Sequence, residues 1–377
     1  MSELLAAAAD RWGTPLYVLD LDLAAANLVR VRAALPGALI AYAVKANHDP
    51  SLLRRLVAEG AGCEVVTGVE LALAMRAGCP PSRIVMNGVG KTDVEAAEAL
   101  RLGALVNAES LDELGALLAL GVRDARIGLR LNPGIETATH RHLATGAATS
   151  KFGIPIDALD AALAMARDAG VTIASVGAHI GSDIDDPAPY RALAARLGAL
   201  DVPAIDLGGG WASVELARGM ADRPGLIVEP GRSLVADAGW LLVRVVRVQP
   251  RDGFAYLVAD AGMSELIRPL LYGAEHPVSL VRAGTAFDAP ATVHLAGPVC
   301  EAGDVLAHDI GRWLDPGELR AVGPGAVLAI GRVGAYGAVM ASTYNGRPRP
   351  AEVVVEAGEA RLSRRRETLE DLVARDA

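Results

Sequence analysis

Between residues 38 and 232 the sequence alternates short apolar runs with longer stretches rich in Ala and Leu. The short runs have the length and apolar character of buried parallel strands, and the longer stretches have a helical period. The predicted strands are 39–44, 62–67, 84–88, 105–109, 127–132, 173–180, 204–208 and 225–229, with helices at 50–60, 68–78, 92–102, 110–121, 156–169 and 187–200. This alternation predicts an α/β fold, a (β/α)8 TIM barrel. A doubly wound open sheet is the alternative that the pattern leaves open.

The pattern changes after residue 240, where strands separated by Gly, Pro and Asp turns follow one another with few helices between them. The predicted strands are 241–249, 254–259, 291–295, 326–330 and 352–356. An amphipathic helix pattern opens the chain, and we expect the run 15–19 that follows it to join the same sheet. We therefore predict a barrel domain over 22–240 and a C-terminal mostly β domain made of 1–21 and 241–377.

Composition narrows the classes of partner. The formal net charge is -9 and the pI is near 5.4, which argues against nucleic acid or an acidic membrane surface as the main partner. Cys63, Cys79 and Cys300 cannot all pair with one another, and their spacing is not that of a zinc site, so we expect no metal. The N-terminal segment lacks the basic region of a signal peptide, and a cytoplasmic location is expected.

Lys45 ends the first predicted barrel strand, in the run from Tyr42 to Asn47. The chemistry of a (β/α)8 barrel sits at the carboxyl ends of its strands. Taken alone, Lys45 is better explained as a side chain that reaches solvent from a strand end. A desolvated lysine, however, has a second use, because it forms Schiff bases with carbonyl groups in enzymes that use pyridoxal 5'-phosphate (PLP).

Three further strand ends carry residues that suit a bound PLP. The run from His179 to Ser182 ends the sixth strand, the run with Gly208, Gly209 and Gly210 ends the seventh, and the run with Glu229, Gly231 and Arg232 ends the eighth. Glycines let backbone N–H groups approach a phosphate, an imidazole stacks on a planar ring, and a carboxylate holds a proton on a pyridine nitrogen. Each group also has a structural explanation: a flexible turn, a structural histidine, or an ion pair between Glu229 and Arg232. Their occurrence at successive strand ends favours a common PLP site.

Almost from end to end, the chain resembles the fold-type III PLP-dependent decarboxylases of the diaminopimelate/ornithine decarboxylase group. The matching motifs are Gly13 to Tyr17, Tyr42 to Asn47, His140 through Gly153, His179 to Ser182, Gly208 to Gly210, Glu229 to Arg232, Asp260 to Met263, Ile267 to Pro269 with Leu271 and Tyr272, Gly297 to Glu301, Ala335 to Gly337 with Tyr344 and Asn345, and Arg364 to Leu372. The resemblance implies PLP as the cofactor and a PLP-binding, alanine racemase-like barrel followed by a β-rich domain. Motifs in this number and order are specific for the superfamily and say less about the substrate.

The resemblance also implies a role for each site residue. The catalytic residues would be Lys45, which carries the cofactor, His179, which stacks on its ring, and Cys300, which returns a proton to Cα. The cofactor would also contact Ser182, Gly208, Gly209, Gly210, Glu229, Gly231, Arg232 and Tyr336. The substrate would be bound by Arg232, Arg268, Tyr272, Glu301 and Tyr336. In this family the Cys-Glu pair reaches the active site of the partner subunit, so a homodimer with shared active sites is expected.

The implied reaction is the decarboxylation of an amino acid, with the conversion of meso-diaminopimelate to L-lysine as the first candidate. Asp183, Ser264 and Ala302 replace the Gln, Asn and Ser that are common in the family, and the segment between Gly210 and Glu229 is short. The alternative substrates are therefore another amino acid, a citryl-amine adduct, or an aminoacyl group on a carrier protein. A racemase would usually set an Arg against the pyridine nitrogen, and an inactive homologue would be expected to lose Lys45 or Cys300.

Overall fold

The computed structural model describes residues 1–134, 150–220, 222–374 and 376. The chain forms two compact units, one of residues Ala24–Leu234 and one that joins Met1–Leu23 to Val235–Ala377. His140, which belongs to one of the matching motifs, lies outside the described residues. Among the helices of the described ranges, none has both the length and the apolar character that a membrane crossing requires.

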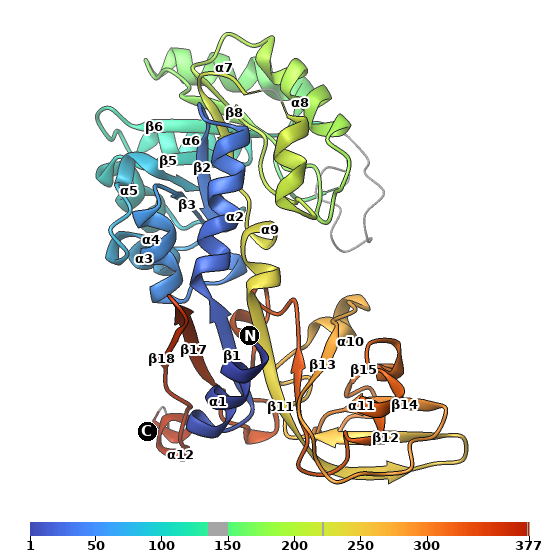
Figure 1. Ribbon diagram of the computed structural model, residues 1–377. Helices are drawn as coiled ribbons and strands as arrows, with labels where there is room; N and C mark the ends of the chain where they lie inside the picture. The colour runs from blue at the N-terminus through green and yellow to red at the C-terminus, as the bar shows by residue number, and fades with distance from the viewer. Residues whose placement is uncertain (135–149, 221, 375, 377) are drawn as a thin grey trace. The chain divides into compact units, whose positions relative to one another are not determined.

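The unit Ala24–Leu234 is built around a closed ring of parallel strands. Figure 1 shows helices packed around these strands. In ring order these are β2 (Leu39–Ala43), β3 (Gly62–Val65), β4 (Ile84–Met86), β5 (Leu105–Ala108), β6 (Arg126–Asn132), β8 (Ser175–Gly177), β9 (Ala204–Asp206) and β10 (Leu226–Val228), which pairs back onto β2. The short β7 (Ile154–Pro155) pairs with β6 beside the ring. Each of the predicted barrel strands lies in the ring, so the (β/α)8 prediction is confirmed and the open sheet is wrong.

The helices after the first strands begin at polar caps. The Asp49 carboxylate accepts the backbone N–H groups of Ser51 and Leu52 at the start of α3, and Thr67, Thr92 and Ser110 cap the next helices in the same manner. The helices of this part of the chain are α2 (Leu21–Ala34), α3 (Pro50–Ala58), α4 (Gly68–Arg76), α5 (Asp93–Leu102), α6 (Leu111–Ala119), α7 (Leu159–Asp168), α8 (Ala188–Gly198) and α9 (Arg232–Val235). Because each cap follows a strand by only a few residues, the chain is fixed at the carboxyl rim of the barrel.

The barrel interior changes from apolar to polar along the strands. Toward the amino ends, Ala41, Val85, Leu105 and Ile227 form an apolar cluster. Asn87, Asn107 and Glu229 each come two residues after one of these apolar residues, Val85, Leu105 and Ile227. Because side chains alternate along a strand with a period of two, the polar residues point to the same side as the apolar ones. These three polar side chains are all buried. The polar layer therefore lies at the carboxyl ends, where barrel enzymes carry their chemistry.

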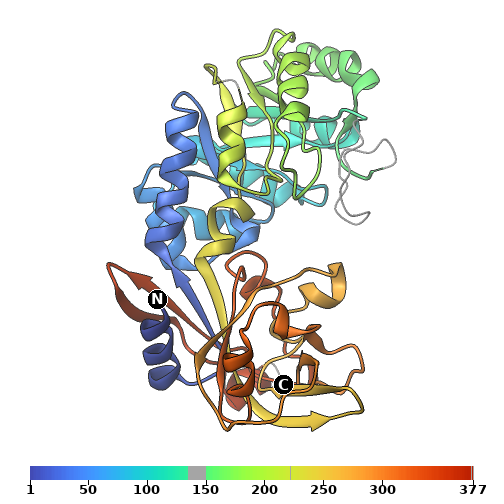
Figure 2. The same ribbon diagram turned by 45° about the vertical axis from the view of Figure 1, so that its right-hand side comes forward.

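The other unit contains a nine-stranded sheet (Figures 1 and 2). Its order is β15 (Val305–Ala307), β14 (Thr292–Ala296), β12 (Phe254–Ala259), β11 (Gly239–Pro250), β1 (Leu16–Asp20), β17 (Ala351–Glu356) and β18 (Glu359–Arg364), while β16 (Val327–Ile330) pairs with β11 and with β13 (Val278–Arg282). The helices described here are α1 (Ser2–Trp12), α10 (Arg268–Tyr272), α11 (Pro316–Arg320) and α12 (Leu369–Val373). Strand β1 pairs with both β11 and β17, which confirms that the run 15–19 joins this sheet.

Candidate active site

Lys45 lies in one turn of 3₁₀ helix, η1 (Val44–Ala46), directly after β2. Its Nζ pairs with Oε2 of Glu64 at 2.6 Å. The Glu64 side chain is 1% exposed and that of Lys45 is 37% exposed, so the amine is accessible while its partner is buried. Sequence reasoning missed Glu64, because only the pairing of β2 with β3 brings it beside Lys45.

Glu229 follows β10 and is buried. Its Oε1 accepts a hydrogen bond of 2.7 Å from Nδ2 of Asn87. Desolvation, together with the negative charges of Asp206 and Glu64, holds the pKa of Glu229 well above its ordinary value. A carboxyl group in this state is suited to share a proton with a ring nitrogen.

His179 is half-buried at the carboxyl end of the barrel. Its Nδ1 accepts a hydrogen bond of 3.3 Å from the backbone N–H of Gly181, so the neutral ring carries its proton on Nε2. Desolvation and the positive charges of Arg130 and Lys45 hold the pKa of His179 well below its ordinary value. A neutral, planar imidazole is therefore available for stacking.

The turn Gly208–Gly210 leaves no room for side chains. Gly208 and Gly210 have φ angles of 66° and 91°, in the region that favours glycine. A Cβ on Gly209 would lie 2.1 Å from the Glu229 carbonyl oxygen, and one on Gly210 would lie 1.9 Å from that of Gly181. The bare backbone is thus packed against both neighbouring strand ends, which is the form of a phosphate-binding turn.

Two residues that sequence reasoning did not single out hold this turn. Tyr190 of α8 is fully buried and donates its OH to the Gly209 carbonyl oxygen at 2.8 Å. Asp206 accepts the Gly208 N–H at 2.8 Å. An aspartate just before a glycine run is a visible turn signal, whereas Tyr190 looks like any apolar helix residue and becomes recognisable only in the folded barrel.

A small cavity of about 10 Å3 lies between His179, Gly208 and Glu229. It is lined by Asn87, Asn107, Arg130, Gly177, Ala178, His179, Asp206, Gly208 and Glu229. Gly231 packs against η1, since a Cβ there would lie 3.0 Å from the Cβ of Ala43 and 3.1 Å from that of Ala46. Ser182 is half-buried after Gly181, and Arg232 opens α9. These residues are suited to bind PLP. Lys45 supplies an amine, His179 a neutral imidazole, the turn Gly208–Gly210 a backbone without side chains, and Glu229 a carboxyl group with a raised pKa.

The remaining predicted site residues belong to the β-rich unit. The guanidinium of Arg268 lies 5.4 Å from the ring centre of Tyr272 and 5.5 Å from that of Tyr336. Tyr336 has a φ of 57°, an unusual conformation for a tyrosine. The structure thus brings three predicted substrate-side or phosphate-side residues into one cluster, in which Arg268 is buried.

Cys300 and Glu301 lie on an exposed turn that a buried carboxylate holds. Asp304 accepts the Val299 N–H at 2.8 Å and the Met263 N–H at 2.6 Å. Burial raises the pKa of Asp304. Cys300 is a free, exposed thiol, so the turn presents it to solvent in this subunit.

Glu301 and Ser264, which sequence analysis connected with the substrate, make different contacts. The Glu301 carboxylate accepts a hydrogen bond of 2.6 Å from the Tyr344 OH. Ser264, by contrast, is 1% exposed, and its hydroxyl donates to Oε2 of Glu265 at 3.0 Å. The replacement at position 264 therefore serves the internal packing of this unit.

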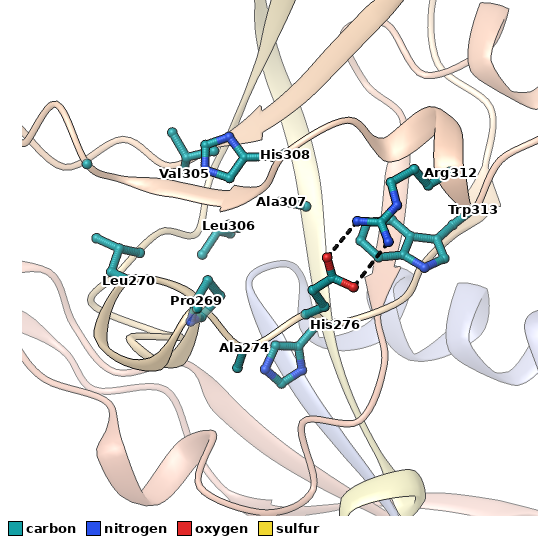
Figure 3. A pocket seen from close by; sticks show the side chains of 13 residues that line it. Pro269, Leu270, Ala274, His276, Val305, Leu306, Ala307, His308, Arg312 and Trp313 are labelled. Carbon is teal, nitrogen blue, oxygen red and sulfur yellow. Dashed lines mark hydrogen bonds and ion pairs between the residues drawn. The ribbon is translucent and has the colours of Figure 1, made fainter. Parts of the chain in front are cut away.

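A larger cavity of about 470 Å3 lies in the same unit (Figure 3). Its walls include the apolar side chains of Pro269, Leu270 and Leu306, and at its edge Arg312 pairs with Glu275 at 2.6 Å. The predicted site residues of this unit, all within the described ranges, are not among those that line it. In the described part of the chain, no group of three or more His, Cys, Asp and Glu side chains could hold a metal ion.

Known proteins match the chain over nearly its whole length. The model of the pyridoxal-binding domain of pyridoxal-dependent decarboxylases matches residues 22–220. The diaminopimelate decarboxylase of Deinococcus radiodurans is 42% identical over 385 residues, which cover 97% of this chain and 97% of that protein. The diaminopimelate decarboxylase of Aquifex aeolicus is 38% identical over 395 residues, which cover 97% of this chain and 92% of that protein.

Solved structures agree with these matches. The crystal structure of diaminopimelate decarboxylase from Helicobacter pylori complexed with L-lysine superposes with a TM-score of 0.86 at 32% identity, over 98% of both chains. The diaminopimelate decarboxylase from M. jannaschii in co-complex with L-lysine superposes with a TM-score of 0.86 at 31% identity, over 99% of this chain and 94% of that one.

Proposed function

Because this chain belongs to the family of pyridoxal-dependent decarboxylases, we propose that it converts meso-diaminopimelate to L-lysine and carbon dioxide. A curated relative with that activity, from Deinococcus radiodurans, has nearly the same length, since the alignment covers 97% of both chains. The short segment between Gly210 and Glu229 thus carries little weight against this substrate.

The observation that carries the reaction type is the environment of Glu229. PLP, when bound, supplies an electron sink for the electron pair that carbon dioxide leaves on Cα. Glu229 holds a proton at the pyridine nitrogen and keeps that sink strong, whereas a racemase would usually place an Arg there. Its burial and its raised pKa support this assignment.

The barrel residues hold the cofactor. Lys45 Nζ, oriented by Glu64, is the amine that attaches it, and the neutral ring of His179 covers one face of the pyridine. The phosphate is bound by the turn Gly208–Gly210. Three further barrel residues complete the phosphate side: Ser182, Gly231 and Arg232.

The β-rich unit handles the substrate. Arg268 binds a carboxylate, which suits the fork of a guanidinium, and Tyr272 lines the same position. Glu301 binds a substrate ammonium group. The Cys300 thiol returns a proton to Cα after carbon dioxide has left; its exposure on a polar turn supports this role.

The working enzyme is, in this proposal, a homodimer in which Cys300 and Glu301 of one subunit complete the active site of the other. The free thiols of Cys63, Cys79 and Cys300 fit a reducing cytoplasm.

The substrate assignment is tested by measuring carbon dioxide release from the PLP-loaded protein. The panel contains meso-diaminopimelate, lysine, ornithine, arginine and a carrier-bound glutamyl group. We expect release with meso-diaminopimelate alone, with L-lysine as the other product. Release from another member of the panel, with none from meso-diaminopimelate, would replace the proposed substrate and leave the reaction type standing.

A further inference from the structure

Asn87 touches both carboxylates that serve the cofactor site. Its single Nδ2 donates to Oε1 of Glu229 at 2.7 Å and to Oε1 of Glu64 at 3.2 Å. Glu64 in turn holds Lys45 Nζ through its other oxygen, at 2.6 Å. One amide group therefore connects the lysine side of the site to the side where a ring nitrogen would be held.

A hydrogen bond to its oxygen fixes the orientation of the Asn87 amide. Asn107 donates Nδ2 to Oδ1 of Asn87 at 2.9 Å, so Nδ2 of Asn87 must point toward the carboxylates. The Ser175 hydroxyl donates to Oδ1 of Asn107 at 3.4 Å. Gly128 makes room for this chain of hydrogen bonds, because a Cβ there would lie 2.0 Å from Oδ1 of Asn107. The hydrogen-bonded side chains of Ser175, Asn107 and Asn87 lie in the barrel interior, and all three are buried.

We propose that Asn87 is a positioning residue that holds Glu64 and Glu229 in one fixed arrangement, so that the Lys45 amine and the proton on the PLP ring nitrogen are set together. This inference rests on the proposed cofactor role of Glu229. An amide N–H stabilises the ionised form of a carboxylate, and Glu229 must be ionised to accept an N–H from a pyridinium. Without this donor, the two carboxylates would repel each other with no group between them.

The charged neighbours of Glu229 make this donor important. The carboxylate charges of Asp206 and Glu64 raise the pKa of Glu229, while the charge of Lys45 lowers it. Arg130 and His179 line the same cavity, and the pKa of His179 is held low. Asn87 is thus the neutral donor that offsets the negative pair next to Glu229.

The test uses the apoprotein titrated with PLP at several pH values and requires no turnover, so it is independent of the substrate assignment. Asn87→Asp keeps the size and the oxygen that accepts from Asn107, but it loses the donor. We expect the PLP dissociation constant to rise about ten- to hundredfold at neutral pH. The difference from wild type should shrink as the pH falls, because the introduced carboxyl group regains an O–H donor once it is protonated.

Two further variants separate an effect on the position of Asn87 from an effect on the stability of the protein. Asn107→Ala removes the group that orients Asn87 and adds no charge, so PLP affinity should fall about three- to tenfold with no new pH dependence. Asn27→Asp is the matched control, since Asn27 is a buried residue of α2 that donates Nδ2 to the Leu234 carbonyl at 2.9 Å and does not line the cavity. It should lower the unfolding temperature and leave PLP affinity unchanged.

The inference is overturned if Asn87→Asp binds PLP within about twofold of wild type across the pH range. It is also overturned if its loss of affinity is the same at every pH and follows its loss of stability, as a purely structural residue would behave.

Discussion

At the carboxyl end of β10, the Glu229 carboxyl is surrounded by Asp206, Glu64 and the Asn87 amide. Burial and the two like charges all disfavour ionisation, and the nearby Lys45 ammonium does not compensate for them, because the net shift of the Glu229 pKa is upward. The folded apoprotein therefore disfavours the ionised form of this carboxyl. A cationic ring nitrogen would stabilise that ionised form, which explains why the arrangement is useful to a PLP enzyme.

The same shift predicts how the apoprotein responds to pH. The folded-state pKa of Glu229 lies above its ordinary value of 4.5, so the folded state retains a proton that the unfolded state releases. The contribution of Glu229 to the free energy of unfolding should thus be fully present below the ordinary pKa and be lost as the pH rises through the window up to the raised pKa. Denaturant unfolding of the apoprotein across this window measures the slope. Glu229→Gln should flatten it, and an unchanged slope in this variant would mean that Glu229 is not the group responsible.

Among the elements, the barrel strands were predictable because each is a buried apolar run bounded by a cap or turn residue. Helix α2 (Leu21–Ala34) was not predicted, and neither were β13, β15 and β18 at the edges of the second sheet. Strands β13 and β18 carry alternating or charged residues, and β15 is only three residues long. The strand-end residues Lys45, His179 and Glu229 were found because they are unusual for their positions.

Their partners could not be found in this way. Glu64 and Asn107 lie on β3 and β5, and Asn87 directly follows β4; the three residues meet only because these strands pair side by side. Tyr190 has the spacing of an ordinary core residue of a helix. Asp304 supports Cys300 through backbone N–H groups, which leave no pattern in the sequence. Contacts of this kind follow from strand pairing and turn geometry, which the local periodicity of a sequence does not encode.

At the scale of the element, the turn Gly208–Gly210 leads to a prediction that compares two Gly→Ala substitutions. Gly209→Ala would place a Cβ 2.1 Å from the Glu229 carbonyl oxygen, so the backbone must move. We expect a loss of about 1–3 kcal/mol in stability and a weaker affinity for PLP. Gly115→Ala is the control: it lies in α6, with only Met165 Cε near, at 3.7 Å. That substitution should stabilise the protein by about 0.5–1 kcal/mol.

Thermal unfolding and PLP titration of both variants measure these effects. Equal behaviour of the two variants would show that the turn has no special requirement for glycine.

For the whole molecule, the proposed functional groups are distributed over the two units of the chain. The barrel unit carries the amine, the ring partners and the glycine turn, and the β-rich unit carries the thiol, the carboxylate and the guanidinium of the substrate side. A dimer in which Cys300 serves the partner's Lys45 predicts complementation between two inactive variants. Lys45→Ala and Cys300→Ala, unfolded and refolded together, should regain about a quarter of wild-type activity, because half of the dimers are mixed and each has one intact site.

Each variant refolded alone is the control and should stay nearly inactive. If the mixture were no more active than the two variants alone while mixed dimers were present, each active site would be formed within one subunit.

The proposed roles of His179, Glu229 and the glycine turn all depend on attachment of the cofactor at Lys45. The sequence contains two other lysines, Lys91 and Lys151. Lys91 Nζ pairs with Glu113 at 2.8 Å, and Lys151 Nζ lies 5.2 Å from the ring centre of Phe152.

The most direct measurement is borohydride reduction of the PLP-loaded protein, followed by mass mapping of its peptides. The mass of the reduced cofactor should appear on the peptide that contains Lys45, and Lys45→Ala should yield no modified peptide. A cofactor found on Lys91 or Lys151, with Lys45 unmodified, would contradict the account.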